Sequence, residues 1–397
     1  MLYRLIIKYF AMWRAEVRNS TDSIGESAVR KVSTPIIIMG VLITGVILTI
    51  IDRPTGVLST TIPQGRSEND RHPNPVAYRA VLLGKLFISS VIFGASPEQC
   101  VGDAVFQERS LTHAIVWCVH RPPIDLNPRG FAYSIAYGTD GRLEVGVGNF
   151  HDGRSGGALL WHGMSRRVVL LNPPGYAFSQ AMAVARGEEV GYVADSSGRK
   201  MAAIWHGSAA SFRSLNPKGF VSSCVSATDG KHQVGYGELP GGAKHALVWS
   251  GTAVSAVDLN PADSVLTEAV GVCESQVVGF GKVGGVMRHA LLWRIDGHGY
   301  VDLNPKQYAT SAAYGTNGVE QVGLAFRTMN GSLPRAIVWC GSANSAINLQ
   351  KALPTKYGYS RAYAVNAEGD IFGMAGTGIH TTCAVEWIPI HIKKVDK

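Results

Sequence analysis

The sequence predicts an all-β protein: a seven-bladed β-propeller of four-stranded repeats of about 44 residues, preceded by a single N-terminal transmembrane helix. Seven tryptophans follow one another at intervals of 44, 44, 44, 44, 46 and 48 residues. Each interval contains four short extended stretches separated by turn residues, and one uncharged apolar segment precedes the first interval. The repeating tryptophans are Trp117, Trp161, Trp205, Trp249, Trp293, Trp339 and Trp387.

The composition agrees with many short buried strands joined by tight turns. Of the 397 residues, 46% are hydrophobic and only 17% are charged, and the chain contains 46 glycines and 18 prolines. A chain of this length holds two or three ordinary domains, but a fixed repeat overrides that expectation because repeats bury their surface only against one another.

The charge is concentrated at the N-terminus. The net charge is +8, and residues 1–79 carry ten Lys/Arg against six Asp/Glu, whereas the remaining residues carry 27 against 23. The nearly neutral repeats lack the basic surface of nucleic-acid readers, so no nucleic-acid partner is expected. The six scattered cysteines form no C-x-x-C pair and are expected to be free buried thiols.

Residues 1–34 form a basic N-terminal segment, and residues 35–51 are predicted to be the transmembrane helix. Residues 35–51 contain no charged side chain, and Pro35 suits the first turn of a helix. At about 1.5 Å per residue the segment spans about 25 Å, slightly less than a hydrocarbon core of about 30 Å. The alternatives are a buried core helix and a signal peptide that starts at Met39, but no small-x-small cleavage site follows Ile51.

This segment predicts a single-pass membrane protein attached through residues 35–51, with a cytoplasmic N-terminus and a periplasmic or extracellular repeat domain. Residues 52–77 form a Pro/Gly/Ser-rich linker, and residues 78–397 form the propeller. The apolar residues 81–95 are expected to be extended rather than a second membrane span, because Lys85 interrupts them.

One repeat illustrates the predicted blade. Its strands are expected at Val221–Ala227, Gln233–Gly237, His245–Trp249 and Val254–Leu259, with glycine-containing turns between them. The strand that ends in Trp is apolar on both faces, as a strand packed between neighbouring blades must be. Glu386 breaks this pattern in the last repeat and is expected to be solvated there.

Two further features concern how blades are joined. Asn-Pro pairs 10 or 11 residues after a Trp predict turns between blades, at Asn127, Asn172, Asn216, Asn260 and Asn304. A stray copy of the fourth strand precedes the first repeat, so residues 78–83 are predicted to complete the last blade and close the ring. A solenoid is the alternative architecture.

The order Ser-x-Ala, Val-Gly-x-Gly, His-Ala-x-x-Trp and Asp-Leu resembles the HAF-type bacterial extracellular repeat. His245–Trp249 and His289–Trp293 are similar to its core, and the resemblance covers roughly residues 81–389. It implies β-rich repeats exported to the cell surface or envelope, without an established enzymatic role. The chain departs from the pattern in having Leu, Ile or Ala in place of Phe, and in having another residue in place of His at Gly157, Met201, Arg335 and Cys383.

Candidate chemistry is sparse. His113, His245 and His289 share one repeat position, which also accepts unrelated residues, so we interpret them as structural rather than as zinc ligands. Asp125, Asp258 and Asp302 share another position and are interpreted as turn caps. No catalytic, cofactor-binding or metal-binding residue is assigned, because the sequence carries no nucleophile, metal or nucleotide motif. The longer sixth and seventh repeats make Arg327–Arg335 and Gln350–Arg361 the expected places for a site.

The sequence therefore predicts a membrane-anchored, exported propeller that serves as a non-enzymatic binding or surface-interaction module for an unknown protein or glycan. The alternative is an enzyme that acts on envelope glycans or other polymers at one end of the propeller channel. An enzyme predicts ionisable groups that converge at one end of the channel, and a binding module predicts loops without such a cluster.

Overall fold

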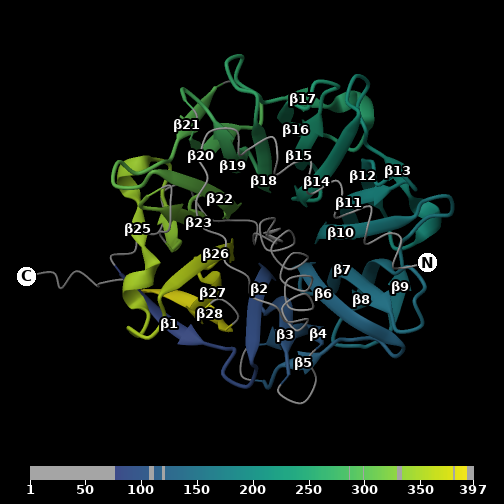
Figure 1. Ribbon diagram of the computed structural model, residues 1–397, viewed down its shortest axis with the longest axis horizontal. Coiled ribbons are helices and arrows are strands. Elements are labelled where there is room, and N and C mark those ends of the chain that lie inside the picture. The colour runs from purple at the N-terminus through teal and green to yellow at the C-terminus, as the bar shows by residue number, and fades with distance from the viewer. Residues whose placement is uncertain are drawn as a thin grey trace, which may run out of the picture. The chain divides into compact units, whose positions relative to one another are not determined.

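The computed structural model describes residues 77–106, 111–118, 121–285, 287–297, 299–328, 333–378 and 381–390. Seven four-stranded antiparallel sheets lie around a central axis (Figure 1), which confirms the seven-bladed propeller. No helix among the described residues is long and apolar enough to cross a membrane. The predicted segments 1–34, 35–51 and 52–77 lie outside the described residues, apart from Ala77.

The strands follow one another from the axis outwards in each blade. Blade 1 contains β2 (Ser89–Ala95), β3 (Gln99–Val105), β4 (Thr112–Cys118) and β5 (Ile124–Asp125). Blade 2 contains β6 (Phe131–Thr139), β7 (Leu143–Phe150), β8 (Gly157–His162) and β9 (Val168–Leu170). Blade 3 contains β10 (Phe178–Ala185), β11 (Glu188–Ala194), β12 (Lys200–Trp205) and β13 (Arg213–Ser214), with the short helix η1 (Ala209–Ser211) before β13.

The remaining blades repeat this order. Blade 4 contains β14 (Ser222–Thr228), β15 (Gln233–Glu238), β16 (Lys244–Trp249), η2 (Ala253–Ser255) and β17 (Val257–Asp258). Blade 5 contains β18 (Thr267–Cys273), β19 (Gln276–Lys282), β20 (Arg288–Arg294) and β21 (Tyr300–Asp302). Blade 6 contains β22 (Thr310–Thr316), β23 (Gln321–Phe326), β24 (Arg335–Trp339), η3 (Ala343–Ser345) and β25 (Ile347–Asn348), and η4 (Leu349–Ala352) follows it. Blade 7 contains β26 (Tyr359–Val365), β27 (Ile371–Gly378), β28 (Thr381–Ile390) and β1 (Ala77–Leu82).

The ring is closed by the first described strand. β1 pairs antiparallel with β28, from Ala77 opposite Ile390 to Leu82 opposite Val385. The predicted closure is therefore confirmed, and the solenoid is excluded. Residues 81–95 are not one strand, because β1 ends at Leu82 and β2 begins at Ser89 on the next blade. Tyr78 also donates a hydrogen bond of 2.9 Å to Glu320 of blade 6, which ties the closing strand to a second blade.

Two other expectations need correction. The fourth strands are shorter than predicted, and in blade 4 the helix η2 replaces the first half of the expected strand Val254–Leu259. Glu386 is half-buried rather than solvated. Burial and the nearby Asp370 raise the pKa of Glu386, and Arg79 lowers it in part.

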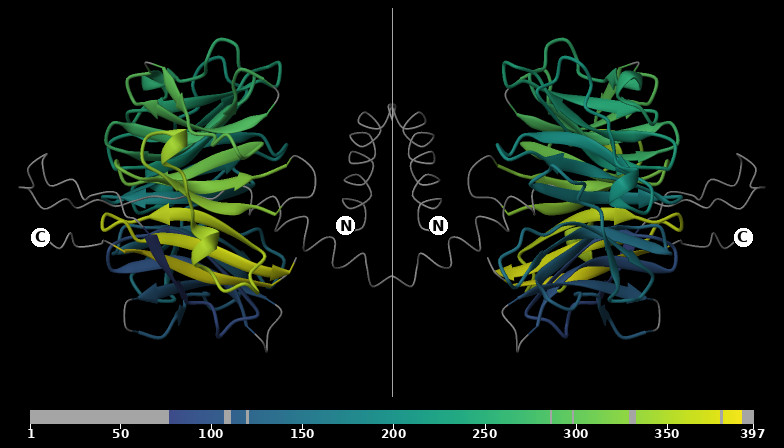
Figure 2. Two further views of the ribbon diagram at one scale, coloured as in Figure 1. Left: turned by 90° about the vertical axis from the view of Figure 1, so that its left-hand side faces the viewer. Right: turned by 90° about the vertical axis from the view of Figure 1, so that its right-hand side faces the viewer.

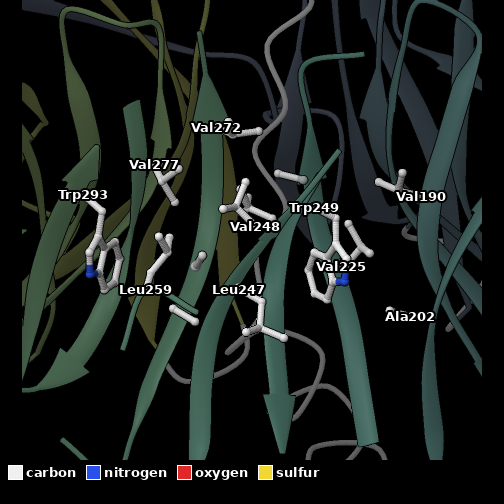
Figure 3. Close-up of a cluster of buried hydrophobic side chains, with 14 of the residues drawn as sticks. Val190, Ala202, Val225, Leu247, Val248, Trp249, Leu259, Val272, Val277 and Trp293 are labelled. Carbon is white, nitrogen blue, oxygen red and sulfur yellow. The ribbon is translucent and has the colours of Figure 1, made fainter. Parts of the chain in front are cut away.

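The tryptophans occupy equivalent places in successive sheets, as predicted. Six of the seven are at most 1% exposed, and Trp117 is 5% exposed. Figure 3 shows Trp249 and Trp293 on neighbouring blades within one apolar cluster that also contains Leu247 and Val272. Burying an indole in each seam removes a large apolar area from water, so these rings are the main source of packing energy between blades.

A hydrogen bond crosses every seam beside these rings. The backbone N–H of the alanine three residues before each Trp donates to a Ser or Thr hydroxyl of the next blade, for example Ala246 to Thr267 at 2.8 Å. In four seams that hydroxyl in turn donates to the Asn of the Asn-Pro turn, as Thr267 does to Asn260 at 2.6 Å. The repeated Ala, Ser/Thr and Asn are therefore one structural device. The same alanine N–H bond is made by Ala114, Ala158, Ala202, Ala290, Ala336 and Ala384.

The strands run between the two faces of the ring (Figure 2), so each loop belongs to one face. We call the upper face the one that carries the loops between the second and third strands and the links between blades. The lower face carries the loops between the first and second strands and between the third and fourth strands.

Candidate active site

A β-bulge in every innermost strand leaves one residue per blade unpaired beside the axis. The register shifts at the same level in each of β2, β6, β10, β14, β18, β22 and β26, and β6 has a second shift between Phe131 and Tyr133. Bulges re-aim a side chain and are frequent beside functional sites. The unpaired residues are Phe93, Tyr137, Met182, Ser226, Val270, Tyr314 and Tyr363.

Four of these residues form an aromatic arc across blades 6, 7, 1 and 2. The ring centroid of Phe93 lies 5.5 Å from those of both Tyr137 and Tyr363, and the Tyr363 and Tyr314 centroids are 5.7 Å apart. All four rings are at most 2% exposed. The arc therefore fills one side of the axis, and the smaller residues of blades 3, 4 and 5 occupy the other side.

Asp103 on β3 lies beside this arc. Its carboxyl occupies the position that follows the Val-Gly pair, where the other blades carry Val147, Tyr192, Tyr236, Phe280, Leu324 and Met374. The Oδ1 atom of Asp103 is buried and has no hydrogen-bond partner among the described residues. Burial raises the pKa of Asp103 to about 7, and a backbone hydrogen bond offsets this in part. The carboxyl therefore gains and loses its proton near neutral pH.

Tyr137 of blade 2 lies close to this carboxyl, and Tyr133 and Tyr192 lie close to Tyr137. Burial raises the pKa of Tyr137 well above its usual value, Tyr192, Asp103 and Tyr133 raise it further, and a hydrogen bond with Gln180 lowers it. Burial also raises the pKa of Tyr133. Tyr192 donates a hydrogen bond of 2.9 Å to the Oε1 atom of Gln180. The phenols of Tyr133 and Tyr137 therefore stay protonated at neutral pH.

We call this group of five residues the Asp103–Tyr137 cluster. It comprises Asp103, Tyr133, Tyr137, Gln180 and Tyr192, from strands β3, β6, β10 and β11. A carboxyl with a near-neutral pKa beside neutral phenols suits proton transfer to and from a bound substrate. Asp103 is half-buried, whereas Tyr137 is fully buried.

The histidines and aspartates that repeat in the sequence do not converge. His113, His245 and His289 each contact the aspartate of their own blade, at 3.1, 2.7 and 2.7 Å from Asp125, Asp258 and Asp302 respectively. Each aspartate also accepts the N–H of the asparagine two residues later at 2.8 Å, which confirms the turn-cap interpretation. Among the described residues, no group of three or more His, Cys, Asp or Glu side chains is arranged to hold a metal ion.

The longer loops of the last repeats hold no comparable cluster in their described parts. Within Gln350–Arg361, the Nε2 atom of Gln350 donates to the Tyr357 carbonyl at 2.7 Å, and Tyr359 donates to the Gly378 carbonyl at 3.0 Å. The described part of Arg327–Arg335 contributes Arg335, whose guanidinium donates to the Gly358 carbonyl. None of the six cysteines, all of which lie within the described residues, forms a disulfide bond.

The similarity between the repeats does not predict the Asp103–Tyr137 cluster. The signal that locates it is a difference between repeats, because a carboxylate stands once where six other copies are apolar. Burying such a group is costly, so its presence at this position calls for a function.

No protein-family model matches this chain, and no curated protein matches it. Solved structures with a similar fold include a puromycin hydrolase, at 10% identity and a TM-score of 0.57. The match covers 82% of this chain. A structure from a study of two prolyl endopeptidases matches at 10% identity and a TM-score of 0.54, over 81% of this chain. The propeller domain of the trilobed protease from Pyrococcus furiosus, described as having an open velcro topology, matches at 8% identity and a TM-score of 0.50, over 78% of this chain.

The coverage of these structures differs. The chain spans 57% of the puromycin hydrolase and 50% of the prolyl endopeptidase, but 95% of the trilobed protease domain. At such low identity, the likeness shows the fold and leaves the reaction open.

The comparisons contradict the prediction of a non-enzymatic binding module. The three structures named above are a puromycin hydrolase, a prolyl endopeptidase and a protease domain. The ionisable cluster beside the axis agrees with this correction, because a binding module predicts none. A propeller alone does not make a chain an enzyme, so the reaction has to be argued from the cluster.

Proposed function

We propose that the chain is an enzyme that cleaves an envelope glycan by acid–base catalysis at the Asp103–Tyr137 cluster. The observation that carries this proposal is the buried carboxyl of Asp103, whose pKa is raised to about 7. A general acid or base works best when its pKa lies near the operating pH. Packing does not account for a carboxyl at this position, because the other blades fill it with apolar side chains.

The residue types favour a glycan over a peptide. In hydrolysis of an acetal, the protonated Asp103 carboxyl gives its proton to the leaving oxygen as the glycosidic bond breaks. A water molecule then forms the new bond to the anomeric carbon and returns a proton to the Asp103 carboxylate. Cleavage of an amide requires an activated nucleophile or a metal ion, and the cluster contains no serine, threonine or cysteine. We assign proton transfer to Asp103 and hydrogen-bond donation to Tyr137 and Tyr133. Gln180 positions the phenols, since it contacts both Tyr192 and Tyr137.

Replacing Asp103 with Asn tests this assignment. In the full chain, release of reducing ends from a panel of peptidoglycan, polygalacturonate and chitin fragments is expected to fall about 100-fold or more, since the general acid is lost. The unsubstituted chain is expected to show a pH dependence with an inflection near pH 7, from the pKa of Asp103. This inflection should disappear in the variant.

Asp195→Asn is the matched control, because Asp195 lies on an exposed loop of the same face, outside the cluster. The control should keep both the rate and the pH profile. An Asp103→Asn variant with unchanged rate and pH profile would contradict the proposal, and so would a complete lack of cleavage of every glycan in the panel.

We propose in addition that residues 35–51 attach the propeller to the membrane and that the ring lies outside the cytoplasm. The support is the uncharged apolar segment and the resemblance to HAF-type extracellular repeats. The full chain should stay with the membranes after alkaline carbonate washing, and deletion of residues 35–51 should release it. Protease added to intact spheroplasts should digest the propeller, and protection of the propeller would reverse the assigned orientation.

A further inference from the structure

Three consecutive blades place a cation over an aromatic ring at the same repeat position. Lys200 lies 4.2 Å from the Tyr192 ring centroid, Lys244 lies 4.6 Å from that of Tyr236, and the Arg288 guanidinium lies 4.6 Å from that of Phe280. Each cation begins the third strand of its blade, and each ring follows a Val-Gly pair on the second strand. We call Lys200, Lys244 and Arg288 the cationic row.

The surroundings of the row hold the charges in place. The three rings are between 3% and 8% exposed, whereas the cations above them are half-buried. Lys244 also contacts Glu268 of the next blade at 3.1 Å. In blade 2, Arg154 also lies over a ring, 4.2 Å from the Phe150 centroid, but at a different repeat position and in an ion pair with Asp152. A cation held over an aromatic face loses little further freedom when it binds an anion.

The two faces of the ring differ in charge. Among the described residues, Lys and Arg outnumber Asp and Glu on the upper face, where the row lies. On the lower face, Asp and Glu are in excess. Separated charges of this kind attract and orient a charged ligand even when the net charge of the domain is small.

The row and the Asp103–Tyr137 cluster share the upper face. Asp103 lies in the second half of β3, opposite Ala114 near the start of β4, which is the same end of the strand that carries Tyr192 in blade 3. Tyr192 belongs to both groups, because it bonds Gln180 of the cluster and lies beneath Lys200. A ligand that spans blades 3 to 5 along the row therefore leads to the cluster.

We infer that the cationic row binds a carboxylate-bearing linear polysaccharide and that the cluster cleaves this polymer, an inference that rests on the proposed function. Cations repeated at one position in successive blades suit a polymer that carries anionic groups at intervals along its chain. Single-stranded nucleic acid requires open aromatic faces on which bases stack, and the rings of the row are covered by its own cations.

The test measures binding of the full chain to polygalacturonate, with fully methyl-esterified polygalacturonate as the uncharged match and polyphosphate as the alternative polyanion. The acid form should bind at least about tenfold more tightly than the ester, and added salt should weaken its binding. Combined Lys200→Gln and Arg288→Gln replacements should remove that preference. Combined Lys231→Gln and Arg294→Gln replacements on the lower face should keep it.

Each other outcome overturns the inference. Equal binding of acid and ester, equal weakening by the lower-face variant, or tighter binding of polyphosphate would each show that the row does not select a carboxylated glycan. Thermal unfolding of both double variants tests whether a loss of binding reflects a loss of folding. Asp103→Asn separates the two proposals, because it should bind polygalacturonate as the unsubstituted chain does but fail to cleave it. If the chain cleaves an uncharged glycan and the Lys200→Gln and Arg288→Gln variant cleaves it equally well, the proposed function is upheld and the inference about the cationic row is not.

Discussion

Replacing Trp249 with Ala is expected to lower the free energy of unfolding by about 3 to 5 kcal/mol. The indole of Trp249 is fully buried and belongs to the cluster that also contains Val225, Val248 and Trp293 (Figure 3). Its Nε1 atom has no hydrogen-bond partner among the described residues. The expected loss is therefore one of apolar burial and packing, and it includes the cavity left between sheets that the rest of the ring holds apart.

Chemical denaturation followed by circular dichroism measures this loss. Trp249→Phe is the matched variant, because it keeps an aromatic ring in the seam and should lose clearly less stability than the alanine variant. Trp161→Ala gives a second comparison, since the Nε1 atom of Trp161 donates to the Leu126 carbonyl at 3.0 Å and that bond is lost as well. Equal midpoints for Trp249→Ala and the unsubstituted chain would contradict the assigned role of the tryptophans.

The sequence predicts those parts of the molecule that are repeated. The Trp and the preceding Ala recur because every seam contains the same buried indole and the same alanine N–H hydrogen bond, and the Asn-Pro turn extends that bond in four seams. The closing strand could also be predicted, because a fourth-strand pattern before the first repeat has no sheet of its own to join. The fourth strands are shorter than the sequence predicts, because apolar residues such as Val254 lie on the exposed outer edge rather than in a strand.

The candidate site could not be predicted in this way, because it consists of departures from the repeat. Asp103 is one polar residue at a position that is otherwise apolar, and its effect on Tyr137 depends on contact between two blades. The sequence gives no measure of such contacts until the register is known. The bulge that releases Tyr137 beside the axis is likewise a property of strand pairing. The loop Gln350–Arg361 stays a predicted place for a site, although loop length carries no information about which side chains converge.

Two seams of the lower face each contain a Gln–Glu hydrogen bond. Gln99 donates to Glu144 at 2.7 Å between blades 1 and 2, and Gln233 donates to Glu188 at 2.8 Å between blades 3 and 4. In both seams a threonine of the second blade completes the contact. The two seams thus contain the same Gln–Glu pair in opposite order.

A second large change in the free energy of unfolding is expected when the acid and the amide are exchanged at these two seams. Glu144→Gln is expected to stabilise the ring by about 2 to 3 kcal/mol at pH 8, because it removes a buried carboxylate. The Oε2 atom of Glu144 has no hydrogen-bond partner among the described residues, and burial raises the pKa of Glu144 to about 7. Gln233→Glu should destabilise the ring by about 3 to 5 kcal/mol at pH 8, because it places a second carboxylate against Glu188.

The pH dependence distinguishes this mechanism from a change in packing. A carboxyl whose pKa is higher in the folded chain than in the unfolded chain contributes stability below the unfolded pKa of 4.5, and this contribution is lost as the pH rises through about 7. The gain from Glu144→Gln should therefore be absent near pH 4.5, grow between pH 4.5 and 7 and stay constant above. Denaturation midpoints at pH 4.5, 6 and 8 measure it, and a gain that is equal at all three would mean that the charge of Glu144 has no part in the effect.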